Sequence, residues 1–183
     1  MPALSPSVTN EFCKLCGWAF ETWLNHRALF DCNQRSAELQ KSLASDTLFR
    51  LSVISQEYSL LQIAKLHDKA IIGGNITLSI EYVVNYGGWS PTTKTHLESL
   101  QRKLELFAAG IRGARNKSLS HNDLSSIVSG ATLGSFAEGE DVEYFKNLQE
   151  FVDLVHDEVI GGPWPFDDLV NNDVAAFLTM LKT

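Results

Sequence analysis

The chain has 183 residues, of which 44% are hydrophobic and 20% charged, a composition typical of one globular domain large enough to bury a core. Its formal net charge of −7 argues against a protein that coats nucleic acid without specificity. It has no apolar run of membrane-spanning length, no N-terminal secretory pattern and only three cysteines, so we expect a cytoplasmic protein that has no disulfide framework and does not associate with membranes.

The first part of the chain predicts two long helices. Apolar residues recur at three- and four-residue spacing from about Asn10 to Asp31 and form one helical face. A second helix begins at Ser45 or Asp46, either of which can cap it, and ends by Gly73. The apolar stripe of this second helix consists of Leu48, Leu51, Ile54, Tyr58, Leu61 and Ala64.

The segment from Asn75 to Tyr86 fits two structures. Every second residue from Ile76 to Tyr82 is apolar, as in a strand, whereas Thr77 could cap a short helix. An isolated strand has no partner here, so the pattern favours the helix.

A long helix is predicted after the loop that ends at Pro91. It begins near Thr92 or Thr93 and runs into Arg115. Its apolar residues have helical spacing throughout and predict a buried face. They are Leu97, Leu100, Leu104, Phe107 or Ala108, and Ile111.

Two further helices complete the chain. One spans about Glu140 to Val159, and acidic residues in its first turn suit the positive end of the helix dipole. Asp173 caps a final short helix that ends at Leu181. The sequence therefore predicts an all-α bundle of five or more helices in one domain, residues 1–183.

The heptapeptide from Arg115 to His121, Arg-Asn-Lys-Ser-Leu-Ser-His, carries the clearest chemical signal. Arginine binds phosphate oxygens as a rigid, permanently charged fork, and histidine is the side chain best suited to moving protons near neutral pH. Arg112 lies three positions before Arg115 and shares its helical face. These groups are sufficient to cleave a phosphodiester without a metal.

Geometry limits what this heptapeptide can do. On an unbroken helix His121 lies about 9 Å along the axis from Arg115 and is rotated roughly 120° from it, so the two would not meet at one phosphate. A helix break near Ser118, or a second copy of the chain across a two-fold axis, could bring them together. The alternative interpretation is a surface histidine at a helix end, with the arginines paired to the acidic helix.

These residues resemble the signature of the HEPN superfamily, in which an arginine, usually followed by a polar residue, precedes a histidine by four to six intervening residues. Five residues intervene here, and Asn116 occupies the polar position. Ala64-Lys65-Leu66-His67-Asp68, Asn75-Ile76-Thr77-Leu78 and His121-Asn122-Asp123 are similar to the AbiU-type abortive-infection branch. The resemblance covers most of residues 48–123.

The resemblance implies an all-α HEPN-like helical bundle that dimerises and acts as a metal-independent endoribonuclease, as in defence or toxin systems. It makes Arg115, Asn116 and His121 the catalytic candidates. His121 would move the proton of the 2′-hydroxyl or of the leaving oxygen, Arg115 would hold the scissile phosphate, and Asn116 would orient one of them. The products would be 2′,3′-cyclic phosphate and 5′-hydroxyl ends, and the substrate RNA, because DNA lacks the 2′-hydroxyl.

The same resemblance extends to supporting residues and partners. Arg112 and Lys117 are candidates for binding RNA, and Asp68 is a second-sphere candidate that orients Arg115, with a capping or salt-bridge role as the alternative. An antitoxin or regulatory partner is compatible with the family. The competing hypothesis is a HEPN-like module without catalysis that binds a protein or a nucleotide.

The sequence suggests neither a cofactor nor a metal site. The one Cys-x-x-Cys pair, Cys13 and Cys16, lies inside an amphipathic helix, and Cys16 falls on its apolar stripe. A structural zinc site normally draws four ligands from such pairs, so a packing role is favoured for both thiols.

Overall fold

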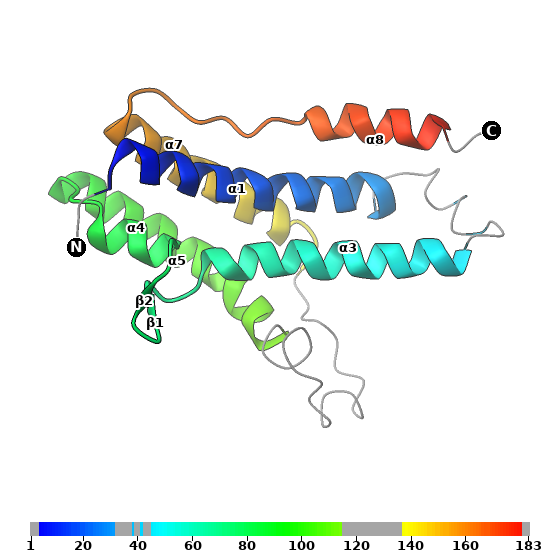
Figure 1. Cartoon of the computed structure of the whole chain (residues 1–183), viewed down its shortest axis with the longest axis horizontal. Helices are drawn as coiled ribbons and strands as arrows, with labels where there is room; N and C mark the ends of the chain where they lie inside the picture. Colours follow the sequence, from blue (N-terminus) through cyan, green and yellow to red (C-terminus); the bar gives the residue numbers. More distant parts are fainter. Residues whose placement is uncertain (1–3, 32–37, 39–40, 42–44, 115–136, 181–183) are drawn as a thin grey trace. The chain divides into compact units, whose positions relative to one another are not determined.

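The computed structural model describes residues 4–31, 38, 41, 45–114 and 137–180 (Figure 1). This part of the chain is mostly helical, as the sequence predicts. Its six α-helices are α1 (Pro6–His26), α3 (Ser45–Leu66), α4 (Ile80–Tyr86), α5 (Pro91–Ala114), α7 (Glu140–Val159) and α8 (Leu169–Met180). A π-helical turn (Arg27–Asp31) follows α1, and two short strands, β1 (Ile71–Ile72) and β2 (Asn75–Ile76), precede α4.

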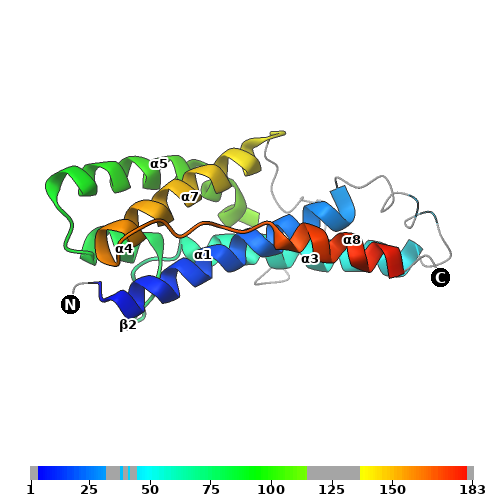
Figure 2. The same cartoon turned by 90° about the horizontal axis from the view of Figure 1, so that it is seen from above.

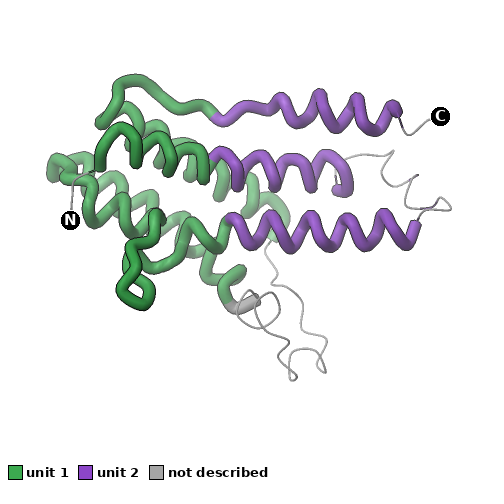
Figure 3. The backbone as a smooth tube through the Cα atoms, viewed as in Figure 1, with its two compact units in different colours: residues 1–16, 63–165 green, residues 17–62, 166–183 purple. Residues whose placement is uncertain are grey.

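The chain divides into two compact units, which Figure 3 shows in different colours. Unit 1 consists of residues 1–16 and 63–165, and unit 2 of residues 17–62 and 166–183. The expectation of one domain over residues 1–183 stays a prediction.

Unit 1 is built around α5 and α7, which run in opposite directions and pack along each other (Figure 2). The apolar stripe predicted for α5 is confirmed, since Leu97, Leu104 and Ala108 are fully buried. On α7, Phe151 is also fully buried and meets the ring of Phe12 edge-on, with 6.0 Å between ring centroids. The shorter α4 packs against α5.

Helix α5 begins at Pro91, one residue before Thr92, the earlier of its two predicted starts. Ser90 caps the helix, because its hydroxyl accepts a hydrogen bond from the backbone N–H of Thr93 (3.2 Å). Pro91 occupies the first helical position, where its missing N–H costs nothing. The neighbouring α7 has the predicted bounds, with three acidic residues in its first turn.

The prediction for Asn75 to Tyr86 is half right. Residues from Ile80 onward form a helix, but Ser79 caps it instead of Thr77, accepting from the Tyr82 N–H (3.3 Å). The first two residues of the segment form β2, which pairs antiparallel with β1. The argument that a strand here has no partner was therefore wrong, because Gly73 and Gly74, both with positive φ, turn the chain back on itself.

In unit 2, the rings of Phe20 and Phe166 stack, with 5.1 Å between their centroids. The Trp18 indole N–H donates to the Tyr58 hydroxyl (3.2 Å). The final helix, α8, packs against the π-helical turn. It begins at Leu169, four residues before the predicted cap Asp173, and the Asp167 carboxylate accepts the Leu169 N–H (3.2 Å) just before the first turn.

The helix predicted from Ser45 begins where expected but ends at Leu66, well before Gly73. Its apolar stripe is only partly buried. Ala64 is fully buried, whereas Leu51, Ile54 and Tyr58 are exposed. The helical spacing thus predicted the helix correctly and its buried face incorrectly.

Candidate functional site

The structure describes two of the six predicted site residues. Arg112 lies in the last turn of α5, and Asp68 follows α3. The other four predicted residues, Arg115, Asn116, Lys117 and His121, lie outside the described residues. The described part of the candidate site therefore lies in unit 1, near the end of α5.

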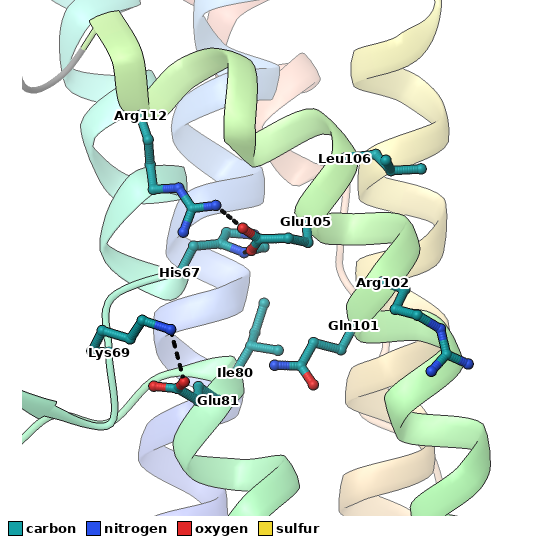
Figure 4. Close-up of a pocket in the computed structure, with 9 residues that line it drawn as sticks. All are labelled: His67, Lys69, Ile80, Glu81, Gln101, Arg102, Glu105, Leu106 and Arg112. Carbon is teal, nitrogen blue, oxygen red and sulfur yellow. Dashed lines mark hydrogen bonds and ion pairs between the residues drawn. The ribbon is translucent and has the colours of Figure 1, made fainter.

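Arg112 lines a cavity of about 650 Å³ in unit 1 (Figure 4). Its walls come from the end of α5, the segment after α3 and the start of α4. The lining residues are His67, Lys69, Ile80, Glu81, Gln101, Arg102, Glu105, Leu106 and Arg112.

The guanidinium of Arg112 forms an ion pair with Glu105, two turns earlier on the same face of α5. The Arg112 side chain is 33% exposed, so its free donors can still reach a ligand in the cavity. Glu105 also contacts His67, with 3.2 Å between its Oε2 and the ring Nδ1.

His67 connects this ion pair to α7. Its side chain is 1% exposed, and its second ring nitrogen, Nε2, lies 3.0 Å from the Tyr144 hydroxyl. Glu105 forms an ion pair with Arg112, and a carboxylate can only accept hydrogen bonds, so we assign the ring proton of neutral His67 to Nδ1. His67 Nε2 then accepts the hydrogen bond that the Tyr144 hydroxyl donates.

Burial keeps His67 neutral. Loss of hydration, followed by the charge of Arg112, lowers the pKa of His67 to about 3, although the charge of Asp68 acts in the opposite direction. Burial also raises the pKa of Tyr144 well above its usual value, so this hydroxyl keeps its proton. The network Arg112–Glu105–His67–Tyr144 therefore contains one ion pair and two directed hydrogen bonds near neutral pH.

A second ion pair lies in the same cavity. Lys69 Nζ is 3.1 Å from Glu81 Oε1, and Glu81 Oε2 accepts the backbone N–H of Ala70 (2.6 Å). This backbone hydrogen bond is the largest cause of a lowered pKa for Glu81. Glu81 is therefore a carboxylate fixed at the start of α4 even without Lys69.

Sequence reasoning missed His67, Glu105, Lys69 and Tyr144 as site residues. The signal for Glu105 was available, because a glutamate and an arginine seven residues apart lie on one helical face. Tyr144 could not be found in this way, since 77 residues separate it from His67 along the chain. Asp68 is half-buried beside His67, and its role in orienting Arg115 stays a prediction.

The two cysteines on α1 are buried free thiols. Burial, with the nearby charge of Asp153, raises the pKa of Cys13 to about 12, and burial also raises the pKa of Cys16 well above its usual range. Neither is a reactive thiolate at neutral pH. Among the residues that the structure describes, His, Cys, Asp and Glu side chains form no group of three or more able to hold a metal ion.

A mostly helical fold, and a long helix whose sequence continues into Arg-Asn-…-His, are the features of a HEPN-type protein. The family model described as AbiU2 matches residues 8–178, nearly the whole chain. The chain therefore belongs to the HEPN AbiU2 family, which confirms the resemblance to an abortive-infection HEPN domain.

No curated protein and no solved structure matches the chain. None of the helices described within residues 4–31, 45–114 and 137–180 is long and apolar enough to span a membrane.

Proposed function

We propose that this protein is a metal-independent endoribonuclease that cleaves RNA to 2′,3′-cyclic phosphate and 5′-hydroxyl ends in a defence or toxin system. The observation that carries the proposal is that the family match, residues 8–178, includes the whole Arg115–His121 heptapeptide. The cavity also supports the proposal, because one of its lining residues is Arg112, which precedes Arg115 by three positions in the sequence.

Each residue of the heptapeptide has a chemical role in this proposal. His121 takes the proton from the ribose 2′-hydroxyl or gives one to the leaving oxygen, which typically accelerates a reaction about a hundred- to ten-thousand-fold. Arg115 binds the scissile phosphate and stabilises the charge that develops on its oxygens. Asn116 orients the phosphate or the histidine, while Arg112 and Lys117 bind the RNA backbone.

The proposal includes the state in which the protein acts. We propose one HEPN-like domain per chain that works as a cytoplasmic homodimer, because two copies can place two heptapeptides in one cleft. An antitoxin or a regulatory partner would control a nuclease of this kind in the cell.

Cleavage of single-stranded RNA in the presence of a chelator, with the solution mass measured in parallel, tests the proposal. The wild-type dimer should cleave, and His121→Ala, with an unchanged circular dichroism spectrum, should not. Native-rate cleavage by His121→Ala would show that the mechanism is wrong. An intact substrate after long incubation with folded wild-type protein would count against a nuclease that is active on its own.

The acidic balance of the chain favours a second candidate function. Eleven acidic residues and one lysine lie between Glu138 and Asp173, a charge pattern that opposes tight RNA binding. A HEPN-like module without catalysis, which binds a protein or a nucleotide, would explain this charge. Intact RNA, together with a partner that copurifies in a defined ratio, would support this candidate.

A further inference from the structure

Of the three cationic residues that line the cavity, Lys69, Arg102 and Arg112, the first and the last share an arrangement. Each is paired with a carboxylate, and each of these carboxylates has a second hydrogen-bond donor of its own (Figure 4). For Glu81 this donor is the backbone N–H of Ala70, at 2.6 Å. For Glu105 it is the Nδ1–H of His67, at 3.2 Å.

This arrangement allows both cations to exchange their carboxylate partner for an anionic ligand. If Lys69 moved to an anionic ligand, Glu81 would keep the hydrogen bond from Ala70, which is the largest single cause of its lowered pKa. If Arg112 moved, Glu105 would keep the bond to His67, which is fixed on its other side by Tyr144. Neither departure leaves a carboxylate without a donor, so the usual penalty for breaking an ion pair is reduced.

The cations are also accessible. The Lys69 side chain is 75% exposed and that of Arg112 33% exposed, and ion pairs at such positions contribute little to stability. Two phosphate oxygens can accept parallel hydrogen bonds from the guanidinium of an arginine. The negative charge of the phosphate also attracts the compact ammonium group of a lysine. The cavity of about 650 Å³ has room for a phosphate together with its nucleoside.

We propose that this cavity is a phosphate subsite for RNA, in which Lys69 and Arg112 leave Glu81 and Glu105 to bind a backbone phosphate other than the one that is cleaved. The inference rests on the proposed ribonuclease function for the identity of its ligand. It adds Lys69 to the substrate-binding residues and makes His67 the positioning residue that retains Glu105.

RNA binding tests the subsite separately from cleavage. In a His121→Ala background, which keeps the RNA intact, the affinity for a single-stranded RNA is measured by fluorescence anisotropy over a series of salt concentrations. Lys69→Gln should weaken binding severalfold and lower the slope of log K against log salt by about 0.7, the value for one lost phosphate contact on a single strand. Arg112→Gln should do the same.

Lys94→Gln is the matched control. It removes the same charge from an exposed position on α5, 18 residues and therefore about 27 Å from Arg112 along the helix. Its affinity and salt slope should equal those of the His121→Ala parent. Equal binding by the Lys69→Gln and Lys94→Gln proteins would overturn the subsite.

The remaining outcomes separate this inference from the proposed function. Cleavage by the wild type, with Lys69→Gln binding RNA like the parent, would remove the subsite and leave the nuclease. Intact RNA with a Lys69-dependent affinity would remove the nuclease and leave the subsite. If the protein binds no RNA but inorganic phosphate raises the melting temperature of the wild type more than that of Lys69→Gln, the ligand is free phosphate and the RNA subsite is overturned.

Discussion

The apolar stripes of α5 and α3 have the same helical spacing but different surroundings. On α5, in unit 1, Leu97 and Leu104 are fully buried, and α7 packs along the helix. On the part of α3 that belongs to unit 2, Ile54 is 60% exposed and Leu51 is exposed as well. Helical spacing thus shows that a segment has an apolar face, while a partner element decides whether that face is buried.

The comparison extends to polar groups. In unit 1 the Tyr144 hydroxyl binds a buried histidine, whereas in unit 2 the Tyr58 hydroxyl binds the exposed indole of Trp18. Similar side chains in similar helices should therefore contribute unequal free energies. Three predictions test this contrast, and they are given in order of decreasing expected effect on stability.

The first prediction compares the two stripes directly. Leu104→Ala should lower the free energy of unfolding by about 2–5 kcal/mol, because it leaves a cavity in the fully buried face of α5. Ile54→Ala should change it by less than about 0.5 kcal/mol, since the side chain is exposed. Urea denaturation of both variants measures the difference. A loss for Ile54→Ala as large as that for Leu104→Ala would show that α3 is covered in solution.

The second prediction compares the two tyrosines. Tyr144→Phe removes the donor to His67 Nε2 and leaves a buried acceptor unsatisfied, which should lower the free energy of unfolding by about 1–3 kcal/mol. Tyr58→Phe removes an exposed hydrogen bond that water can replace, and should change it by less than about 0.5 kcal/mol. Thermal and urea unfolding of the matched pair provide the measurement. Equal losses of unfolding free energy in the two variants would contradict a buried hydrogen bond from Tyr144 to His67.

The third prediction concerns pH. The pKa of His67 is lowered to about 3 in the folded protein, from about 6.5 in the unfolded chain. Between these values the unfolded state binds more protons, so stability is retained above pH 6.5 and falls as the pH falls toward 3. The slope is at most about 1.4 kcal/mol per pH unit.

Comparing the wild type with His67→Gln isolates this contribution from that of the carboxylates. The advantage of the wild type over His67→Gln should shrink as the pH falls from 7 to 4.5. Thr92→Ala, an exposed substitution on α5 that removes no titratable group, serves as the control and should leave the pH profile unchanged. A constant difference between the wild type and His67→Gln would mean that His67 is not held neutral.

The sequence predicted the long helices where local signals and packing agree. The bounds of α7 follow from the acidic first turn at Glu140 and from Gly161 and Gly162 after its end. The start of α8 was predicted too late, because Asp168 and Asp173 are both residues of a type that caps helices and spacing does not choose between them. The strands β1 and β2 have two residues each, too few to form a recognisable alternating pattern.

The candidate site was predicted only in part for a similar reason. Arg112 was identified because it shares a helical face with Arg115 and lies near it in the sequence. His67 and Tyr144 come together through the packing of α7 in unit 1, a contact that no local spacing encodes. The AbiU2 family match spans the heptapeptide, and the roles proposed for its residues are chemical predictions.

The most direct test of the central claim is an analysis of the RNA ends produced by the purified protein in the presence of a chelator. Mass spectrometry of the fragments should show 2′,3′-cyclic phosphate and 5′-hydroxyl ends that are absent when His121→Ala replaces the wild type. Such ends require attack by the neighbouring 2′-hydroxyl, which is the reaction assigned to Arg115 and His121. Fragments with 5′-phosphate and 3′-hydroxyl ends, or cleavage that stops when the chelator is added, would contradict the account.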